Sequence, residues 1–197
     1  LAHNGVLFLD EFPEFQKNVL EALRQPLEDG AITVSRAYGT FSYPARFMLV
    51  ATKNPCPCGY YQTNQKECTC SMAQIVQYQK KVSGPIADRI DMHIEVPAVE
   101  YAKLIAPGTQ GESERAREHI KQARALQAAR FEHERVALNA HLNVRHMKKH
   151  CLLDNASQTM LSQAMTTLKL SARVYHKIIK IARTIADLEQ SELIKPH

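Results

Sequence analysis

Four consecutive apolar residues are followed at once by two carboxylates near the start of this chain. Residues 6–9 read Val-Leu-Phe-Leu, and Asp10 and Glu11 come directly after them. A short continuous apolar run is typical of a strand that is buried on both faces of a parallel sheet. Such sheets bind ligands at the edge where their strands end. The pair therefore predicts a site where Asp10 holds Mg²⁺ on a nucleotide and Glu11 orients a water for attack on the γ-phosphate. The same residues also fit a buried strand followed by an acidic helix start.

The acidic pair has the form of a Walker B motif, but the Walker A motif that should accompany it is missing. That motif reads G-x-x-x-x-G-K-[ST] and cradles the nucleotide phosphates. None of the seven glycines is followed by lysine, and the chain begins at Leu1 rather than at Met. We therefore expect a C-terminal fragment of a longer protein, which lacks the phosphate-binding half and does not hydrolyse ATP by itself.

Composition and charge place the chain among globular proteins. Of its 197 residues, 45% are hydrophobic, and no apolar stretch has the length of a membrane span. Clustered cysteines without a secretory signal favour the cytoplasm. Residues 1–97 carry nine basic and ten acidic residues, whereas residues 98–197 carry sixteen and ten. The basic second half favours a polyanion such as DNA as partner, or a solvated helical surface.

The first 97 residues are predicted to be α/β. A helix is expected from about Phe15, closed by Pro26, and a hairpin over residues 32–43. A second buried strand covers residues 46–52, and a helix follows over residues 73–82. The alternation of apolar residues over 90–96 predicts a last strand. A Cys/Pro/Gly-rich insertion, residues 55–71, interrupts this part.

An all-helical part is predicted after a linker at residues 98–111. Residues 112–197 show helical patterns over 112–133, 144–151, 156–168 and 172–188. Ser171 is a suitable N-cap for the last of these helices. Its core face is predicted from the spacing of five apolar residues: Ile178, Ile179, Ala182, Ile185 and Ala186.

Three further residues could act on a nucleotide. Asn54 follows the second strand and could reach the γ-phosphate or the attacking water, or it is an ordinary turn residue before a proline. Arg89, which lies between two aspartates in the sequence, is either part of a structural ion pair or an arginine finger for a neighbouring subunit. Arg173 begins a helix against the helix dipole, which makes it a candidate ligand for phosphates.

Four of the five cysteines form two close pairs. Cys56 and Cys58 precede Cys68 and Cys70 by one short loop, which predicts a closed structural Zn²⁺ site. Two disulfides or free thiols are the alternatives. Cys151 stands alone and is expected in the core.

Two more patterns leave their function open. His146 and His150 have helical spacing but no acidic or cysteine partner nearby in the sequence, which favours a surface position. The predicted hairpin carries Arg36, Tyr38, Phe41 and Tyr43, with Arg46 just after it. Such residues could grip a DNA strand by phosphate contacts and stacking, or pack on the sheet.

Taken in order, five segments resemble the magnesium-chelatase-related AAA+ ATPases of bacteria, the ComM/YifB group. They are HNGVLFLDEFPEF, LEDGAITVSRA, FSYPARFMLVATKNPCPCG, SGPIADRIDMHIEVP and LSARVYHKIIKIARTIADLE. The resemblance implies an α/β part, which is a partial AAA+ P-loop NTPase core from Walker B to the arginine finger, followed by an all-α lid domain. It implies that Asp10 and Glu11 are Walker B, Asn54 is sensor 1, Arg89 is the arginine finger and Arg173 is sensor 2, with ATP and Mg²⁺ as cofactors.

The resemblance also implies a function. Members of this group that resemble ComM are homo-hexameric motors on DNA that promote branch migration when incoming single-stranded DNA recombines. Other relatives insert Mg²⁺ into porphyrins, so a motor subunit that remodels a protein partner is an alternative, as is a non-catalytic zinc-stabilised module. One departure lies before Asn54, where Thr52-Lys53 replaces the expected small apolar pair.

Overall fold

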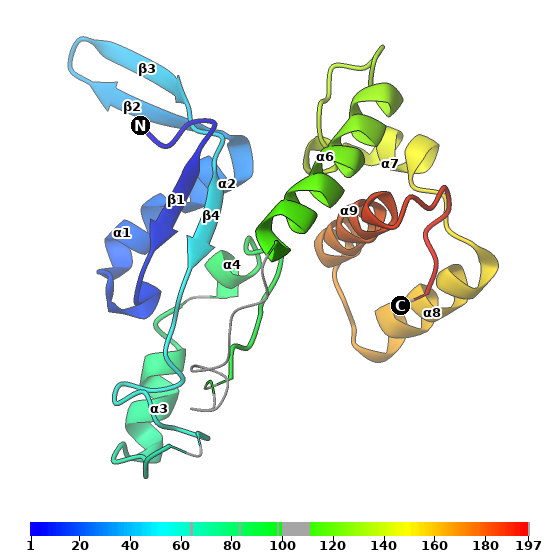
Figure 1. Ribbon diagram of the computed structural model, residues 1–197. Helices are drawn as coiled ribbons and strands as arrows, with labels where there is room; N and C mark the ends of the chain where they lie inside the picture. The colour runs from blue at the N-terminus through cyan, green and yellow to red at the C-terminus, as the bar shows by residue number, and fades with distance from the viewer. Residues whose placement is uncertain (64, 83, 98, 100–110, 197) are drawn as a thin grey trace. The chain divides into compact units, whose positions relative to one another are not determined.

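The computed structural model describes residues 1–63, 65–82, 84–97, 99 and 111–196 (Figure 1). The chain divides into two compact units, Leu1–Leu104 and Ile105–His197. The linker predicted over residues 98–111 falls outside the described residues except for Val99 and Gly111.

The first unit contains a pair of parallel strands. β1 (Val6–Leu9) pairs with β4 (Met48–Ala51), so both predicted apolar strands form and end at the same edge. The prediction that they are buried on both faces is wrong for the described residues. Val6 and Met48, which are partners in the register, are 60% and 63% exposed. Leu9, on the opposite face, packs against the buried cluster of this unit, so one face of the two-stranded sheet is covered and the face with Val6 and Met48 is exposed.

Short helices follow β1 and carry the core of this unit. They are the 3₁₀ helix η1 (Phe12–Glu14), α1 (Lys17–Ala22) and α2 (Arg24–Asp29). Phe12, Leu20 and Ile86 form one cluster of buried apolar residues in this unit. Pro26 does not close a helix as predicted but lies in the first turn of α2. The first turn tolerates proline because its N–H groups have no partner within the helix.

In the chain, an antiparallel two-stranded ribbon follows α2 and precedes β4. β2 (Ala31–Arg36) and β3 (Gly39–Pro44) pair from Ala31 opposite Pro44 to Arg36 opposite Gly39, which confirms the predicted hairpin. Figure 1 shows the ribbon extending from the end of the sheet where β1 and β4 begin.

Two helices follow β4, and one predicted strand is missing. α3 (Met72–Gln79) is capped by Ser71, and α4 (Gly84–Ala87) is a single turn. The strand predicted over residues 90–96 is wrong, because these residues form no regular element. Ile94 and Val96 are 79% and 82% exposed. Alternation alone does not make a strand without a neighbour to pair with.

The second unit is helical. Its elements are α6 (Glu112–Arg130), the 3₁₀ helix η2 (Asn139–His141), α7 (Val144–His150), α8 (Asn155–Thr167) and α9 (Ala172–Leu188). The predicted cap of α9 is confirmed, because the Ser171 hydroxyl accepts a hydrogen bond from the Val174 amide at 3.3 Å. No helix in the described part of the chain combines the length and apolar character that a membrane crossing requires.

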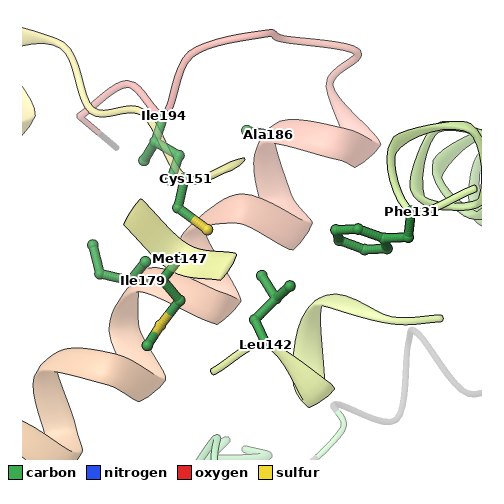
Figure 2. Close-up of a cluster of buried hydrophobic side chains, with 7 residues drawn as sticks. All are labelled: Phe131, Leu142, Met147, Cys151, Ile179, Ala186 and Ile194. Carbon is green, nitrogen blue, oxygen red and sulfur yellow. The ribbon is translucent and has the colours of Figure 1, made fainter. Parts of the chain in front are cut away.

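Apolar side chains from several helices form the core of this unit (Figure 2). Cys151 lies in it, as predicted, and burial raises the pKa of its thiol to about 11. The buried cluster consists of Phe131, Leu142, Met147, Cys151, Ile179, Ala186 and Ile194.

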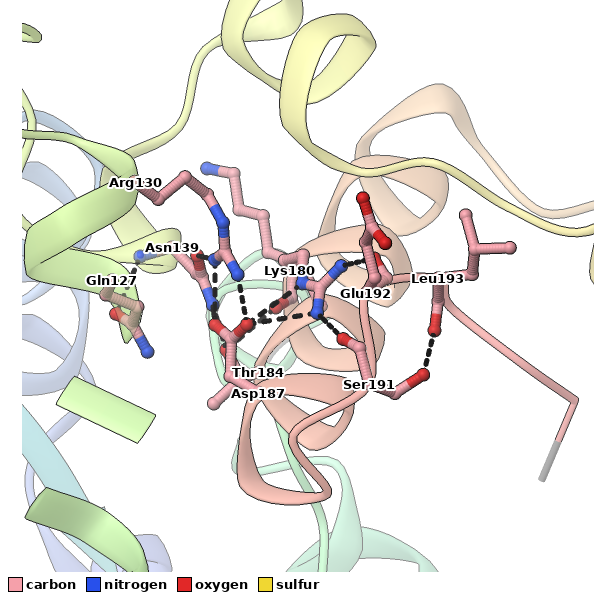
Figure 3. Close-up of polar contacts among 10 residues, drawn as sticks. Gln127, Arg130, Asn139, Lys180, Thr184, Asp187, Ser191, Glu192 and Leu193 are labelled. Atoms are coloured by element: carbon pink, nitrogen blue, oxygen red, sulfur yellow. Dashed lines mark hydrogen bonds and ion pairs between the residues drawn. The ribbon is translucent and has the colours of Figure 1, made fainter. Parts of the chain in front are cut away.

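The buried face of α9 is more polar than its apolar spacing predicts. Ile179 and Ala186 are buried as expected, but Ile185 is 38% exposed. Arg183 and Asp187 are instead 1% and 0% exposed. Arg183 Nε donates to the Asp187 carboxylate at 3.1 Å, and Figure 3 shows Asp187 with Arg130 of α6 and other polar groups.

Candidate functional site

Thr52 ties the acidic pair to the end of the neighbouring strand. Its amide donates to the Leu9 carbonyl at 3.0 Å, which extends the pairing of β1 and β4 by one residue. Its hydroxyl donates to the Asp10 carboxylate and accepts a hydrogen bond from the Glu11 amide at 3.0 Å. Asp10 and Glu11 are both exposed, so their carboxylates face solvent at the edge of the sheet. This edge can receive a charged ligand without opening the core.

Glu11 has an unusual backbone. Its φ of 50° and ψ of 46° are left-handed, and it caps η1. The left-handed turn sends Phe12 and Pro13 into the core, where both are buried, while Glu11 stays at the surface. The Phe12 amide then donates to the Thr52 carbonyl at 2.8 Å, so both strands hold the turn.

Asn54 lies at the same edge, two residues beyond Thr52, and is exposed. Burial raises the pKa of the Tyr78 phenol on α3, and the nearby Asn54 backbone opposes this shift in part. Asn54 and Tyr78 also line a small cavity of about 40 Å³. The structure therefore brings Asp10, Glu11 and Asn54 to one edge, as expected of neighbouring parallel strands.

Arg89 is held inside its own unit. Its guanidinium pairs with Glu28 of α2 and donates to the Pro85 carbonyl, and its side chain is 9% exposed. Among the described residues, its Nε is a buried side-chain nitrogen without a hydrogen-bond partner. An arginine finger would have to leave the pairing with Glu28, so that role stays a prediction. Arg173 lies in the first turn of α9, in the second unit.

The four clustered cysteines converge. Cys56 Sγ lies 3.4 Å from Cys58 Sγ and 3.7 Å from Cys68 Sγ, and all four sulfurs, including Cys70, are within 4.8 Å of one another. Tetrahedral Zn²⁺ with Zn–S bonds of ~2.3 Å requires sulfurs roughly 3.8 Å apart. The sulfurs are too far apart for disulfides, and all four thiols are free. The Tyr61 amide donates a hydrogen bond to Cys56 Sγ at 3.3 Å. The donor set therefore fits Zn²⁺.

Sequence reasoning missed the partner of the two histidines. Glu134 lies 3.3 Å from His146 Nε2 and 3.3 Å from His150 Nε2, and 2.6 Å from Lys149 Nζ. Lys149 and then His150 lower the pKa of Glu134 to about 2. The expected surface position is wrong, because the two histidine side chains are only 16% and 11% exposed. Glu134 precedes them by more than a helical turn, so local spacing could not reveal it.

Two family descriptions together cover most of the chain. Residues 1–104 match the family described as "Magnesium chelatase, subunit ChlI", and residues 110–197 match "Magnesium chelatase, subunit ChlI C-terminal". The chain therefore belongs to the magnesium chelatase ChlI family, whose domains have the AAA+ fold. The α/β first unit and the helical second unit agree with this class.

Particular relatives are similar over nearly the whole chain. The competence protein ComM of Haemophilus influenzae is 44% identical over 100% of this chain and 38% of its own length. The uncharacterized protein YifB of Escherichia coli is 41% identical over 98% of this chain and 37% of its own length. An uncharacterized protein of Mycobacterium bovis is 35% identical over 95% of this chain. The chain thus spans little more than a third of the length of these relatives.

Proposed function

We propose that this chain is the Walker B and lid portion of a cytoplasmic, ATP-driven AAA+ motor. The observation that carries the proposal is the shared edge of β1 and β4, where Thr52 contacts both Asp10 and Glu11. There Asp10 would hold Mg²⁺, which neutralises charge on the phosphates, and Glu11 would orient the attacking water. Asn54, on the adjacent strand end, would contact the γ-phosphate or that water. In the whole protein, the phosphate cradle would come from residues outside this chain.

The remaining charged candidates fit a ring of subunits. In a head-to-tail homo-hexamer, Arg89 of one subunit would reach the nucleotide of its neighbour, and Arg173 of the lid would contact the phosphates. Membership of the AAA+ class supports this arrangement. The pairing of the Arg89 guanidinium with Glu28 would then have to change when subunits assemble.

DNA is the substrate that the hairpin favours. Tyr38 at its tip is 98% exposed, and Phe41 and Tyr43 are 51% and 55% exposed, with Arg36 at the end of β2. Exposed aromatic and basic side chains can stack on bases and contact phosphates. β4 runs from the base of this ribbon to the Asn54 segment, so it links the two mechanically. The similarity to a protein named for competence supports a role in remodelling DNA during recombination.

We expect a full-length protein that carries this chain to bind single-stranded DNA at low salt and to hydrolyse ATP faster when DNA is present. Tyr38→Ala should weaken DNA binding about 5- to 150-fold, because one stacked base contributes about 1–3 kcal/mol. Tyr38→Phe keeps the ring and should bind as the parent does. Fluorescence anisotropy with labelled oligonucleotides measures this. The absence of both DNA binding and DNA-stimulated turnover would rule out the DNA motor.

A protein-remodelling motor is the second candidate, favoured by the description of the family as a magnesium chelatase subunit. A partner protein, rather than DNA, would then stimulate ATP turnover. The same turnover assay, run with DNA and with candidate partner proteins, separates the two functions.

We also propose that Cys56, Cys58, Cys68 and Cys70 bind one structural Zn²⁺. The purified chain should contain about one zinc per molecule, and Cys58→Ser should lose it. Cys151→Ala removes a thiol outside the cluster and should keep the metal. Elemental analysis together with thiol titration provides the measurement. A chain without zinc whose four clustered thiols all react freely would refute the site.

A further inference from the structure

We propose that a cavity at the base of the hairpin binds one backbone phosphate of the DNA strand, with Arg46 as its cationic ligand. The identity of the bound group rests on the DNA-binding function proposed above. The cavity has a volume of about 600 Å³ and is lined by residues of the N-terminal segment, the end of α2 and the base of the ribbon. Figure 1 shows the N-terminal segment beside that base.

The backbone of Arg46 is fixed by the N-terminal segment. Its amide donates to His3 Nδ1 at 3.1 Å, and its carbonyl accepts a hydrogen bond from the Asn4 amide at 2.6 Å. Because Nδ1 of His3 is an acceptor in this contact, the other ring nitrogen, Nε2, carries the proton and is a donor. His3 also lines the cavity, so the contact that fixes Arg46 prepares a second donor there.

The side chain of Arg46 lies against Gly30, the C-cap of α2. Gly30 has a φ of 64°, and a Cβ at this position would lie 3.0 Å from Arg46 Cγ and 3.4 Å from Arg46 Nε. Glycine therefore provides both the left-handed end of the helix and the room for the arginine stem. A guanidinium whose stem is confined in this way loses less conformational freedom when it binds a ligand.

Several polar groups of the cavity are available to a ligand. Within the described part of the chain, no hydrogen bond or ion pair joins the Arg46 guanidinium, the Ser42 hydroxyl or the Asp29 carboxylate to another residue. The guanidinium and the hydroxyl are donors, and the planar guanidinium matches the geometry of phosphate oxygens. Asp29 opposes an anion. The affinity of an isolated phosphate should therefore be low, and the site should act on a phosphate that the rest of a bound strand delivers.

The ribbon connects its exposed tip with this cavity. Side chains alternate between its two faces, so Phe41 and Tyr43 lie on one face, whereas Ser42 lies on the other and lines the cavity. The six paired positions of the ribbon span about 17 Å. A strand with one base stacked on Tyr38 at the tip would therefore follow the Ser42 face and place a phosphate several nucleotides away at Arg46.

The test is the salt dependence of single-stranded DNA binding by a full-length protein that carries this chain, measured by fluorescence anisotropy. Arg46→Gln keeps most of the stem and removes the charge. It should weaken binding about three- to tenfold at low salt, as expected for one lost hydrogen-bonding group. The slope of the logarithm of the binding constant against the logarithm of the salt concentration should become shallower by about 0.7, the value for one phosphate of a single strand.

Two control variants separate a local contact from a general effect of charge. Arg46→Lys keeps the positive charge, so its salt slope should equal that of the parent. Arg24→Gln removes an arginine of α2 that already pairs with Glu21 at 2.8 Å, so affinity and slope should both stay unchanged.

An oligonucleotide in which one phosphate is replaced by an uncharged methylphosphonate locates the contact. At one linkage, this replacement should weaken binding by the parent but add nothing to the loss caused by Arg46→Gln. Asp29→Asn removes the opposing charge and should tighten binding by up to about fivefold, which is typical of one exposed charge pair. That gain should be lost when the same linkage is uncharged.

The outcomes distinguish this site from the function on which it rests. Unchanged affinity and slope in Arg46→Gln overturn the site, and so does a loss of binding that depends on no single linkage. If Tyr38→Ala weakens binding in the same assay and Arg46→Gln does not, the hairpin binds DNA and only the phosphate site is wrong. A parent protein that binds no DNA refutes the DNA motor together with the site.

Discussion

Glu11→Gln is expected to lower ATP turnover of a full-length protein that carries this chain by at least about a hundredfold, with nucleotide binding retained. The carboxylate is proposed to orient and polarise the attacking water, and such a group typically contributes 10²–10⁴-fold. Glutamine has the same shape, so the Glu11 amide keeps its hydrogen bond to the Thr52 hydroxyl. Asp10 and its proposed Mg²⁺ site are untouched. Phosphate release measures turnover, and a fluorescent ATP analogue measures binding.

The matched control for this variant is Glu95→Gln. Glu95 is an exposed carboxylate in the irregular segment before Pro97, so its replacement removes one negative charge without changing the acidic pair. The Glu95→Gln protein should hydrolyse ATP at the rate of the parent. Parental turnover by Glu11→Gln would remove Glu11 from the mechanism, and loss of nucleotide binding would show that its role is structural.

Asp187→Asn is expected to destabilise the second unit by about 3–5 kcal/mol, which is typical when one member of a buried ion pair is removed. Asp187 accepts hydrogen bonds from Arg130 Nη1 at 2.9 Å, Arg183 Nε at 3.1 Å and Asn139 Nδ2 at 2.7 Å (Figure 3). Asparagine keeps the shape but leaves two guanidinium groups without their counter-charge. Of these, the Arg183 side chain is only 2% exposed. Urea unfolding of the chain, followed by helical circular dichroism, measures the free energy.

The control for this variant is Glu118→Gln on α6. Glu118 pairs with Lys121, but both side chains are more than half exposed. Its loss should therefore change the free energy of unfolding by at most about 1 kcal/mol. An Asp187→Asn chain as stable as this control would show that the network contributes little.

The contribution of Asp187 to the stability of the second unit should depend on pH, because its partners shift its pKa. Burial raises the pKa of Asp187, but hydrogen bonds from Arg130 and Asn139 and the charge of Arg183 outweigh it, so the pKa falls below its ordinary 3.8. The unfolded chain then binds a proton before the folded one as the pH drops. The stability from this carboxylate is therefore complete well above pH 4 and is lost below it. The difference between the parent and Asp187→Asn should shrink over that acidic range.

Elements with strong local signals could be predicted from the sequence. β1 and β4 have continuous apolar runs, the hairpin has β-rich segments on either side of a short turn, and α9 begins at a serine cap. The predictions failed where neighbours decide the outcome. Residues 90–96 alternate as a strand does, but they have no partner strand within the described part of the chain. Arg183 and Asp187 were not among the residues predicted for the core face of α9, yet they are buried, where their opposite charges pair.

The candidate site was predictable to a similar extent. Asp10, Glu11 and Asn54 could be placed at one edge because parallel strands end together, and the cysteines could be grouped by their spacing. Thr52 could not be found, since a hydroxyl at a strand end shows its partners only after folding. The partner of Arg89 is Glu28, 61 residues away, and no local pattern indicates such a pair.

The left-handed backbone of Glu11 has a consequence for how such a site evolves. Glycine adopts that conformation without steric penalty, and asparagine adopts it more readily than glutamate does. Roughly 1 kcal/mol of conformational strain therefore accompanies the glutamate. Selection for folding stability alone would therefore favour glycine at this position. A protein that keeps the carboxylate gives up some stability at this one residue. Variant libraries selected only for thermal stability would therefore lose Glu11.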